Sequence, residues 1–112
     1  MRYNYRMDKD AIKKAMLAHH IFPNKKGYKY LLAVVEYVFK MRPAKLSDAY
    51  DAAALQFGVK PNSIEKSISD AIESSFDNAE NAGRYGFLAS AESGKITNKR
   101  FVAILIKEIH NA

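Results

Sequence analysis

The segment Tyr28–Met41 is apolar on nearly every side when it is drawn as a helix, and this feature limits the fold more than any other. Its apolar residues recur at the three- and four-residue spacing of a helix and cover two faces. Those on the first face are Tyr28, Leu31, Leu32, Val35 and Phe39, and those on the second are Val34, Tyr37 and Val38. A helix of this kind has to be covered by neighbouring elements. The sequence therefore predicts a central helix inside a single core.

Four further segments carry the helical spacing and can supply this cover. They are Asp8–His19, Ser47–Phe57, Pro61–Phe76 and Asn98–His110, and another short helix or turn is expected near Phe76–Gly83. No segment shows the alternating pattern of a strand. The predicted fold class is therefore all-α, with about five to six helices around the central one.

Particular residues mark the ends of these helices and the expected core. The predicted N-caps are Asp8 or Asp10 for the first helix, Ser47 for the third and Thr97 for the last. Gly27 and Gly58 occupy turns, where we expect backbone angles that other residues rarely adopt. The residues expected to form a dry core are Leu31, Leu32, Val35, Phe57, Ile64, Ile68, Phe101 and Leu105.

The length and the composition exclude several classes of protein. The 112 residues suit one domain, with residues 1–7 as a flexible arm. There is no Cys, which excludes disulfides and thiolate metal sites. The adjacent His19 and His20 point about 100° apart on a helix and cannot share a metal. Without a phosphate-binding glycine loop or a nucleophile motif, we expect no enzyme activity, metal or cofactor. The lack of a membrane-length apolar run or signal peptide suggests a cytoplasmic protein.

The formal charge of +6 is unevenly distributed along the chain. Residues 1–45 carry eleven Lys or Arg against three Asp or Glu, a net +8. Residues 46–93 carry three against eight, a net −5, and residues 94–112 carry four against one, a net +3. A basic total favours an anionic partner such as nucleic acid. The attraction is expected to come from the two ends of the chain.

The segment Ala53–Ile68 fits a helix-turn-helix. Ala54 is small enough for two helices to cross closely, and Gly58 can supply the tight turn between them. Ile64 and Ile68 then fill the wedge between the two helices. Such a unit projects its second helix outward, and the usual target is the major groove of DNA. A tight corner between two core helices would give the same pattern.

Three anchors follow one another along the chain. They are Lys26-Gly27-Tyr28-x-Tyr30-Leu31, then Ala54-x-x-Phe57 with Ile64-Glu65-Lys66-x-Ile68-x-x-Ala71-Ile72-Glu73, and finally Lys95-x-Thr97-Asn98-x-x-Phe101. In order and separation they resemble the family of C-terminal DNA-binding domains of the sporulation-initiation response regulator, stage 0 sporulation protein A. The resemblance implies an all-helical fold that binds duplex DNA, with Pro61–Phe76 as the recognition helix. These 112 residues hold no counterpart of the family's receiver domain.

The charge pattern and the resemblance together give the candidate DNA-binding residues. On the recognition helix these are Asn62, Ser63, Glu65, Lys66, Ser67, Ser69 and Asp70, and the candidates for phosphate contact are Lys25, Lys26, Lys29, Lys95, Lys99 and Arg100. The family carries Arg at the positions of Ser63, Lys66 and Ser69, and His at the position of Asp70. Because arginine makes bidentate contacts with guanine, we expect altered or weakened sequence specificity here.

An alternative function keeps the fold without DNA binding. Between Asn62 and Phe76 a single Lys stands against Glu65, Asp70 and Glu73, and such an acidic face suits a protein partner. The chain would then be a protein–protein interaction module. The resemblance also suggests two further partners. One is a second copy of the chain bound to DNA, and the other is RNA polymerase. The loop Asp77–Lys95, in the region associated with polymerase contact in the family, is shorter in this chain.

Overall fold

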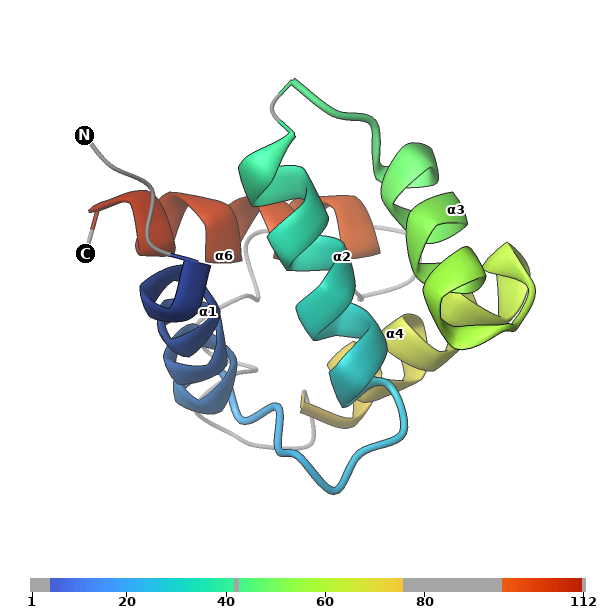
Figure 1. Ribbon diagram of the computed structural model, residues 1–112. Helices are drawn as coiled ribbons and strands as arrows, with labels where there is room; N and C mark the ends of the chain where they lie inside the picture. Colours follow the sequence, from blue (N-terminus) through green and yellow to red (C-terminus); the bar gives the residue numbers. More distant parts are fainter. Residues whose placement is uncertain (1–4, 42, 76–95, 112) are drawn as a thin grey trace.

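Helix α2 (Tyr28–Lys40) runs through the middle of the computed structural model and packs against each of the other described helices (Figure 1). These are α1 (Tyr5–Ala18), α3 (Leu46–Phe57), α4 (Pro61–Ser75) and α6 (Asn98–Asn111). The structure describes residues 5–41, 43–75 and 96–111, and these contain no strand. The predicted all-α fold around a central helix is confirmed. The short helix expected near residues 76–83 lies outside the described residues.

The core forms around one face of α2. Leu31, Val34 and Val35 are completely buried there and meet the apolar stripes of the neighbouring helices. Those stripes contain Ile12 and Met16 of α1, Ala49 and Ala53 of α3, Ile64 and Ile68 of α4, and Phe101 and Leu105 of α6. Burial of each large side chain of this kind stabilises the fold by roughly 1.5–3 kcal/mol.

Two residues predicted for the dry core lie at its edge. Leu32 and Phe57 are only half-buried and pack against the core from outside. Leu32 follows Leu31, and a step of about 100° around the helix turns it away from the core axis. Phe57 ends α3, where its ring lies edge-on to Tyr30 with 5.2 Å between the ring centroids. The prediction of full burial is therefore wrong for both residues.

Helix α1 begins before the predicted position. Its first residue is Tyr5, inside the stretch 1–7 that the sequence suggests as an arm. Asp8 and Asp10 consequently stand within the helix, and the prediction that one of them is the N-cap is wrong. The N-cap position precedes Tyr5 and lies outside the described residues.

The C-terminal end of α1 is closed by a residue in the left-handed region. His20 has a φ of 62°, and its amide donates to the carbonyl of Leu17 at 3.0 Å. The amide of Ile21 donates to the carbonyl of Met16 at the same distance. Met16 and Ile21 are both buried, which is the apolar contact that often accompanies this cap. The helix therefore ends at Ala18, one residue before the predicted end.

Helix α3 begins at Leu46, one residue earlier than predicted. Lys45 occupies the N-cap position with an extended backbone and makes no side-chain capping bond. Ser47 lies inside the first turn, so its predicted capping role is wrong. The other end agrees with the sequence, because Gly58 adopts the left-handed φ of 66° and its amide donates to the carbonyl of Ala54.

Gly27 is needed for space rather than for an unusual backbone angle. Its φ of −76° is in the ordinary right-handed region, which contradicts the prediction. A Cβ atom added at Gly27 would lie 2.2 Å from the carbonyl oxygen of Ser67 and 3.0 Å from the Cβ atom of Ala71. The start of α2 therefore packs directly on the backbone of α4.

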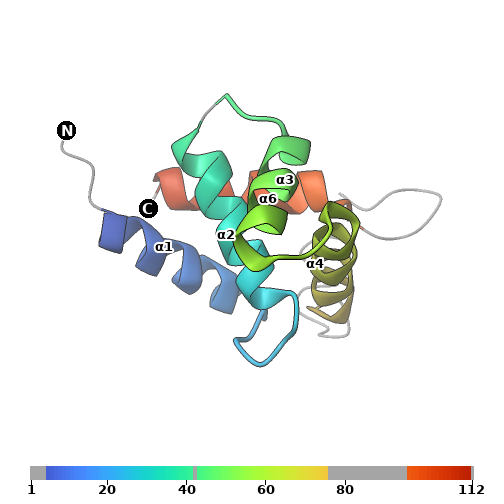
Figure 2. The same ribbon diagram turned by 45° about the vertical axis from the view of Figure 1, so that its right-hand side comes forward.

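Helix α6 completes the core on the side of α2 that faces away from the viewer in Figure 1. Thr97 caps it as predicted, since its Oγ1 accepts a hydrogen bond from the Arg100 amide at 3.2 Å. The two views place α1 and α4 on opposite sides of α2 (Figure 2). None of the described helices has the length and apolar character needed to span a bilayer.

We expect Ile68→Ala to lower the free energy of unfolding by about 2–5 kcal/mol, because Ile68 is fully buried and its truncation leaves a cavity. Leu32→Ala removes a half-buried side chain and should cost clearly less. Chemical denaturation followed by circular dichroism measures both changes. Equal losses in the two variants would contradict the position of Leu32 at the edge of the core.

Gly27→Ala should destabilise the protein by about 1–3 kcal/mol, the usual cost of forcing an extra group into a packed site. The new methyl group has to displace the backbone of α4 at Ser67. Gly58→Ala is the matched control, because a Cβ atom there meets nothing within 4 Å and the cost arises from the positive φ alone. The amide chemical shifts of residues 63–71 should move in the first variant only. Unchanged stability and shifts in Gly27→Ala would show that the two helices are not in contact.

Candidate nucleic-acid interface

Helices α3 and α4 form the predicted helix-turn-helix around the left-handed Gly58. Three isoleucines at four-residue intervals hold α4 against the rest of the fold, with exposed fractions of 0% for Ile64 and Ile68 and 2% for Ile72. On the α3 side, the small residues Ala53 and Ala54 are buried and permit the close crossing. The inward face of α4 is therefore fixed, and its opposite face is turned to solvent.

The outward face of α4 carries nearly all of the candidate base-reading residues. Six of them are exposed, namely Asn62, Ser63, Glu65, Lys66, Ser69 and Asp70. Ser67 is half-buried, because its backbone lies against Gly27 at the start of α2. This face can offer hydrogen-bonding groups to base edges, which is how a helix reads the major groove.

Two lysines from the turn before α2 lie beside this face. Lys25 and Lys26, which we call the basic turn, line a groove together with Ser63, Lys66, Asp70 and Ser74 of α4. This α2–α4 groove has a volume of about 460 Å³. The close contact between Gly27 and Ser67 sets the distance between its two walls. Residues about 40 positions apart in the sequence thus form one surface.

Lys29 does not take part in the α2–α4 groove. Its ammonium nitrogen lies 5.3 Å from the ring centroid of Tyr30 and 5.4 Å from that of Phe57. These are cation–π distances, which hold the side chain over the end of α3. The structure therefore separates Lys29 from Lys25 and Lys26, although all three are close in sequence.

The last helix contributes cations to the other side of α4. Lys99 lines a second hollow together with Asn62, Glu65, Lys66 and Ser69. Arg100 is exposed on the first turn of α6, one residue farther along. Lys95 lies outside the described residues. Lysines from the two ends of the chain thus flank the outward face of α4.

Asn98 fixes the position of α4 through contacts that the sequence does not reveal. Its Nδ2 donates to the hydroxyl oxygen of Tyr50 at 3.1 Å and to the backbone carbonyl of Glu65 at 3.2 Å. The amide group therefore ties α3, α4 and α6 together. Asn98 belongs to one of the resemblance anchors, but the anchor gives no sign of these two partners.

The contact between α3, α4 and α6 also affects the pKa of the Tyr50 hydroxyl. Burial raises the pKa of the Tyr50 hydroxyl above its ordinary value. The hydrogen bond from Asn98 opposes this shift, and the nearby carboxylate of Glu65 adds to it. The hydroxyl thus stays protonated at neutral pH and acts as a neutral hydrogen-bonding partner for Asn98.

His19 and His20 have separate surroundings. His19 is buried, and its Nε2 lies 2.8 and 2.7 Å from the two carboxylate oxygens of Glu108. His20 points elsewhere and packs its ring against Phe22 with 6.1 Å between centroids. Within residues 5–41, 43–75 and 96–111, no group of three or more His, Cys, Asp or Glu side chains could hold a metal ion.

Comparison with known proteins agrees with this arrangement. The model of one protein family, described as "Sporulation initiation factor Spo0A C terminal", matches residues 12–109 of this chain. The matched range contains the basic turn, both helices of the helix-turn-helix and the start of α6. No match was found among curated proteins, and none was found among solved structures. The chain therefore belongs to the Spo0A C-terminal family, whose members are DNA-binding domains of sporulation transcription regulators.

Proposed function

We propose that this domain binds duplex DNA by inserting the outward face of α4 into the major groove, while lysines on either side of α4 contact the phosphates. The observation that carries this proposal is the α2–α4 groove, which brings Lys25 and Lys26 beside Ser63 and Lys66. A helix that enters the groove is flanked by the two phosphate backbones, so cations on both sides fit that geometry.

The base readout of α4 is proposed to be weaker than in the family, or directed at other sequences. The exposed Ser63, Lys66 and Ser69 stand where the resemblance implies arginines. A bidentate arginine–guanine pair contributes about 1–3 kcal/mol of discrimination, and serine cannot form it. The carboxylate of Asp70 adds repulsion toward phosphate and toward acceptor atoms of bases. We infer that flanking lysines supply most of the affinity.

Other partners follow from the resemblance. A regulator of this kind acts where the chromosome is, so we propose a cytoplasmic location. We propose two further partners. One is a second copy of the chain bound to the same DNA, and the other is RNA polymerase. The alternative function is a protein-interaction module that uses the exposed acidic residues of α4, namely Glu65, Asp70 and Glu73. Direct measurement of DNA affinity distinguishes the two functions.

Affinity for random-sequence duplex DNA should fall steeply with salt, because each phosphate neutralised by a lysine contributes about −0.9 to the log–log slope. Lys25→Ala/Lys26→Ala should flatten this slope by roughly 1–2 units. Fluorescence anisotropy with a labelled duplex at several salt concentrations measures the slope.

The matched control for this experiment is Lys13→Ala/Lys14→Ala, which removes the same charge from exposed positions on α1. Its slope should stay close to that of the parent protein. Equal flattening in both double variants would mean that DNA affinity depends on net charge alone and that the basic turn makes no specific phosphate contacts. Absence of any DNA binding at low salt would favour the protein-interaction module.

Substitutions on α4 test whether this helix reads DNA. Asp70→Asn should tighten binding, because it removes a negative charge facing the duplex, and Lys66→Ala should weaken it by about 1–3 kcal/mol if Lys66 contacts a base. Asp51→Asn on the exposed side of α3 is the control for the loss of one negative charge. If DNA still binds and neither α4 variant changes its affinity, α4 is not the recognition helix. If Asp70→Asn instead weakens a complex with a protein partner, the alternative function holds.

A further inference from the structure

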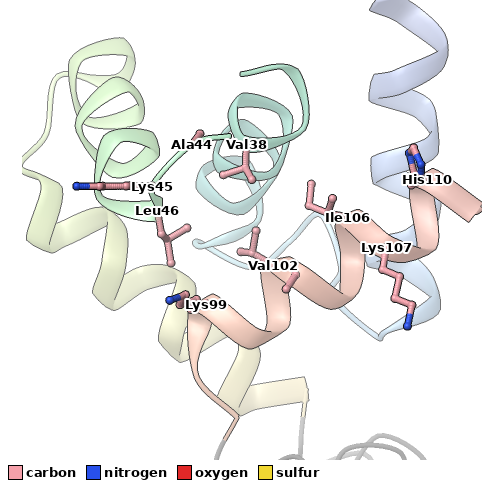
Figure 3. A pocket seen from close by; sticks show the side chains of 10 residues that line it. Val38, Ala44, Lys45, Leu46, Lys99, Val102, Ile106, Lys107 and His110 are labelled. Carbon is pink, nitrogen blue, oxygen red and sulfur yellow. The ribbon is translucent and has the colours of Figure 1, made fainter. Parts of the chain in front are cut away.

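A second groove lies at the opposite end of α2, between that helix, the start of α3 and the length of α6. Four apolar side chains converge on it, namely Val38, Leu46, Val102 and Ile106 (Figure 3). We call this the α2–α6 groove, and its volume is about 610 Å³. Val38, Leu46 and Ile106 are half-buried, so part of their apolar surface remains in contact with water. The groove is therefore an apolar depression that the described residues leave unfilled.

The rim of the α2–α6 groove is basic. Its ionisable lining residues are Lys45, Lys99, Lys107 and His110, and the described lining includes no Asp or Glu. Lys45 and Lys99 lie at one end of the groove and His110 lies near the other, and the side chains of Lys45 and Lys107 extend away from its centre (Figure 3). Within the described part of the chain, the three lysines form no ion pair. These cations are available to an acidic partner.

The groove is elongated. Lys99 and His110 are eleven residues apart on α6, and at 1.5 Å per residue this corresponds to about 16 Å. A partner helix of about three turns has the same length. Such a helix docks by placing apolar side chains at three- and four-residue spacing into a hydrophobic groove, and it places its charged residues at the rim. The basic ends of this groove complement a helix that is acidic.

The α2–α6 groove lies apart from the basic turn of the proposed DNA-binding surface. The basic turn precedes the first residue of α2, whereas Val38 lies in its last turn. The thirteen residues of α2 span about 20 Å, so the basic turn and the Val38 end of the groove are roughly that far apart. Leu46 and Lys99 border both the α2–α6 groove and the hollow beside α4. A partner in the groove leaves the basic turn and most of α4 uncovered.

We propose that the α2–α6 groove binds an acidic amphipathic helix from another protein. The partner's apolar residues contact Val38, Leu46 and Ile106, and its carboxylates face Lys45, which does not border the hollow beside α4. The partner and DNA occupy the domain at the same time. This interaction does not depend on which DNA sequence α4 reads, nor on whether α4 reads DNA at all.

A synthetic peptide provides the probe. It has about fifteen residues, with leucines at i, i+3, i+4 and i+7 and glutamates on its other faces, and it carries a fluorescein label. The full chain should raise the anisotropy of this peptide in a saturable way. Amide shifts of the ¹⁵N-labelled chain should change at residues 102–106 and not at residues 25–27. A peptide with lysine in place of every glutamate should bind at least about tenfold more weakly, a difference of 1.4 kcal/mol.

Variants of the chain locate the contact. Lys45→Glu/Ala103→Glu places two negative charges at the groove and should weaken the acidic peptide at least about tenfold, since opposed like charges are costly. Ala103 is exposed and lines the groove, so this change is compatible with folding. Lys45→Glu alone is a second variant, expected to weaken binding by a smaller factor. Lys13→Glu/Lys14→Glu on α1 lowers the net charge by four units, one more than Lys45→Glu/Ala103→Glu, and should still have little effect on peptide binding. Circular dichroism confirms that each variant is folded.

Several outcomes would overturn the proposal. These are no binding of the acidic peptide, equal binding of the acidic and basic peptides, shifts centred on the basic turn, or equal losses in the groove and α1 variants. Displacement of the peptide by a short DNA duplex would also overturn it, because the two would then share one surface. Laurate binding in the groove with the peptide excluded would assign the groove to a small amphipathic anion. DNA titration of the same samples tests the proposed function separately.

Discussion

The contact between Gly27 and the backbone of Ser67 determines how the basic turn meets α4, and the arrangement of the candidate site depends on it. Without a side chain at Gly27, the first turn of α2 approaches α4 until its backbone touches that of α4. The same approach carries Lys25 and Lys26 to the edge of the outward face of α4. The absence of a Cβ atom at Gly27 therefore permits the close packing of α2 on α4 and also places two lysines beside α4.

The helices and their order could be predicted because each buried stripe repeats at helical spacing. Gly58 and Thr97 could also be assigned, since a left-handed turn and an N-cap depend on neighbouring residues only. The incorrect predictions share a different origin. Ser47 is predicted as an N-cap, but a serine is equally compatible with the first turn of a helix. Leu32 is predicted in the core, but the rotation of α2 that leaves it at the edge is fixed by four neighbouring helices.

The candidate site divides in the same way. The exposed residues of α4 follow from the spacing of Ile64, Ile68 and Ile72, so sequence alone could predict that face. The separation of Lys29 from the basic turn could not be predicted, because it depends on the rings of Tyr30 and Phe57. The role of Asn98 could not be predicted either, because its hydrogen-bond partners Tyr50 and Glu65 are 48 and 33 residues away in the sequence. Charge near α4 is therefore a property of the tertiary structure rather than of any single segment.

The contact between α1 and α6 has a consequence for how the chain folds. His19 and Glu108 are 89 residues apart, and the ring of His19 also lies edge-on to Phe101 at 5.7 Å. Closing so long a loop costs conformational entropy before any contact compensates for it. During synthesis from the N-terminus, the buried face of α1 lacks its α6 partner until the last helix has been made. We therefore expect cooperative completion of this fold only after α6 has left the ribosome, with the earlier helices forming a partly assembled intermediate until then.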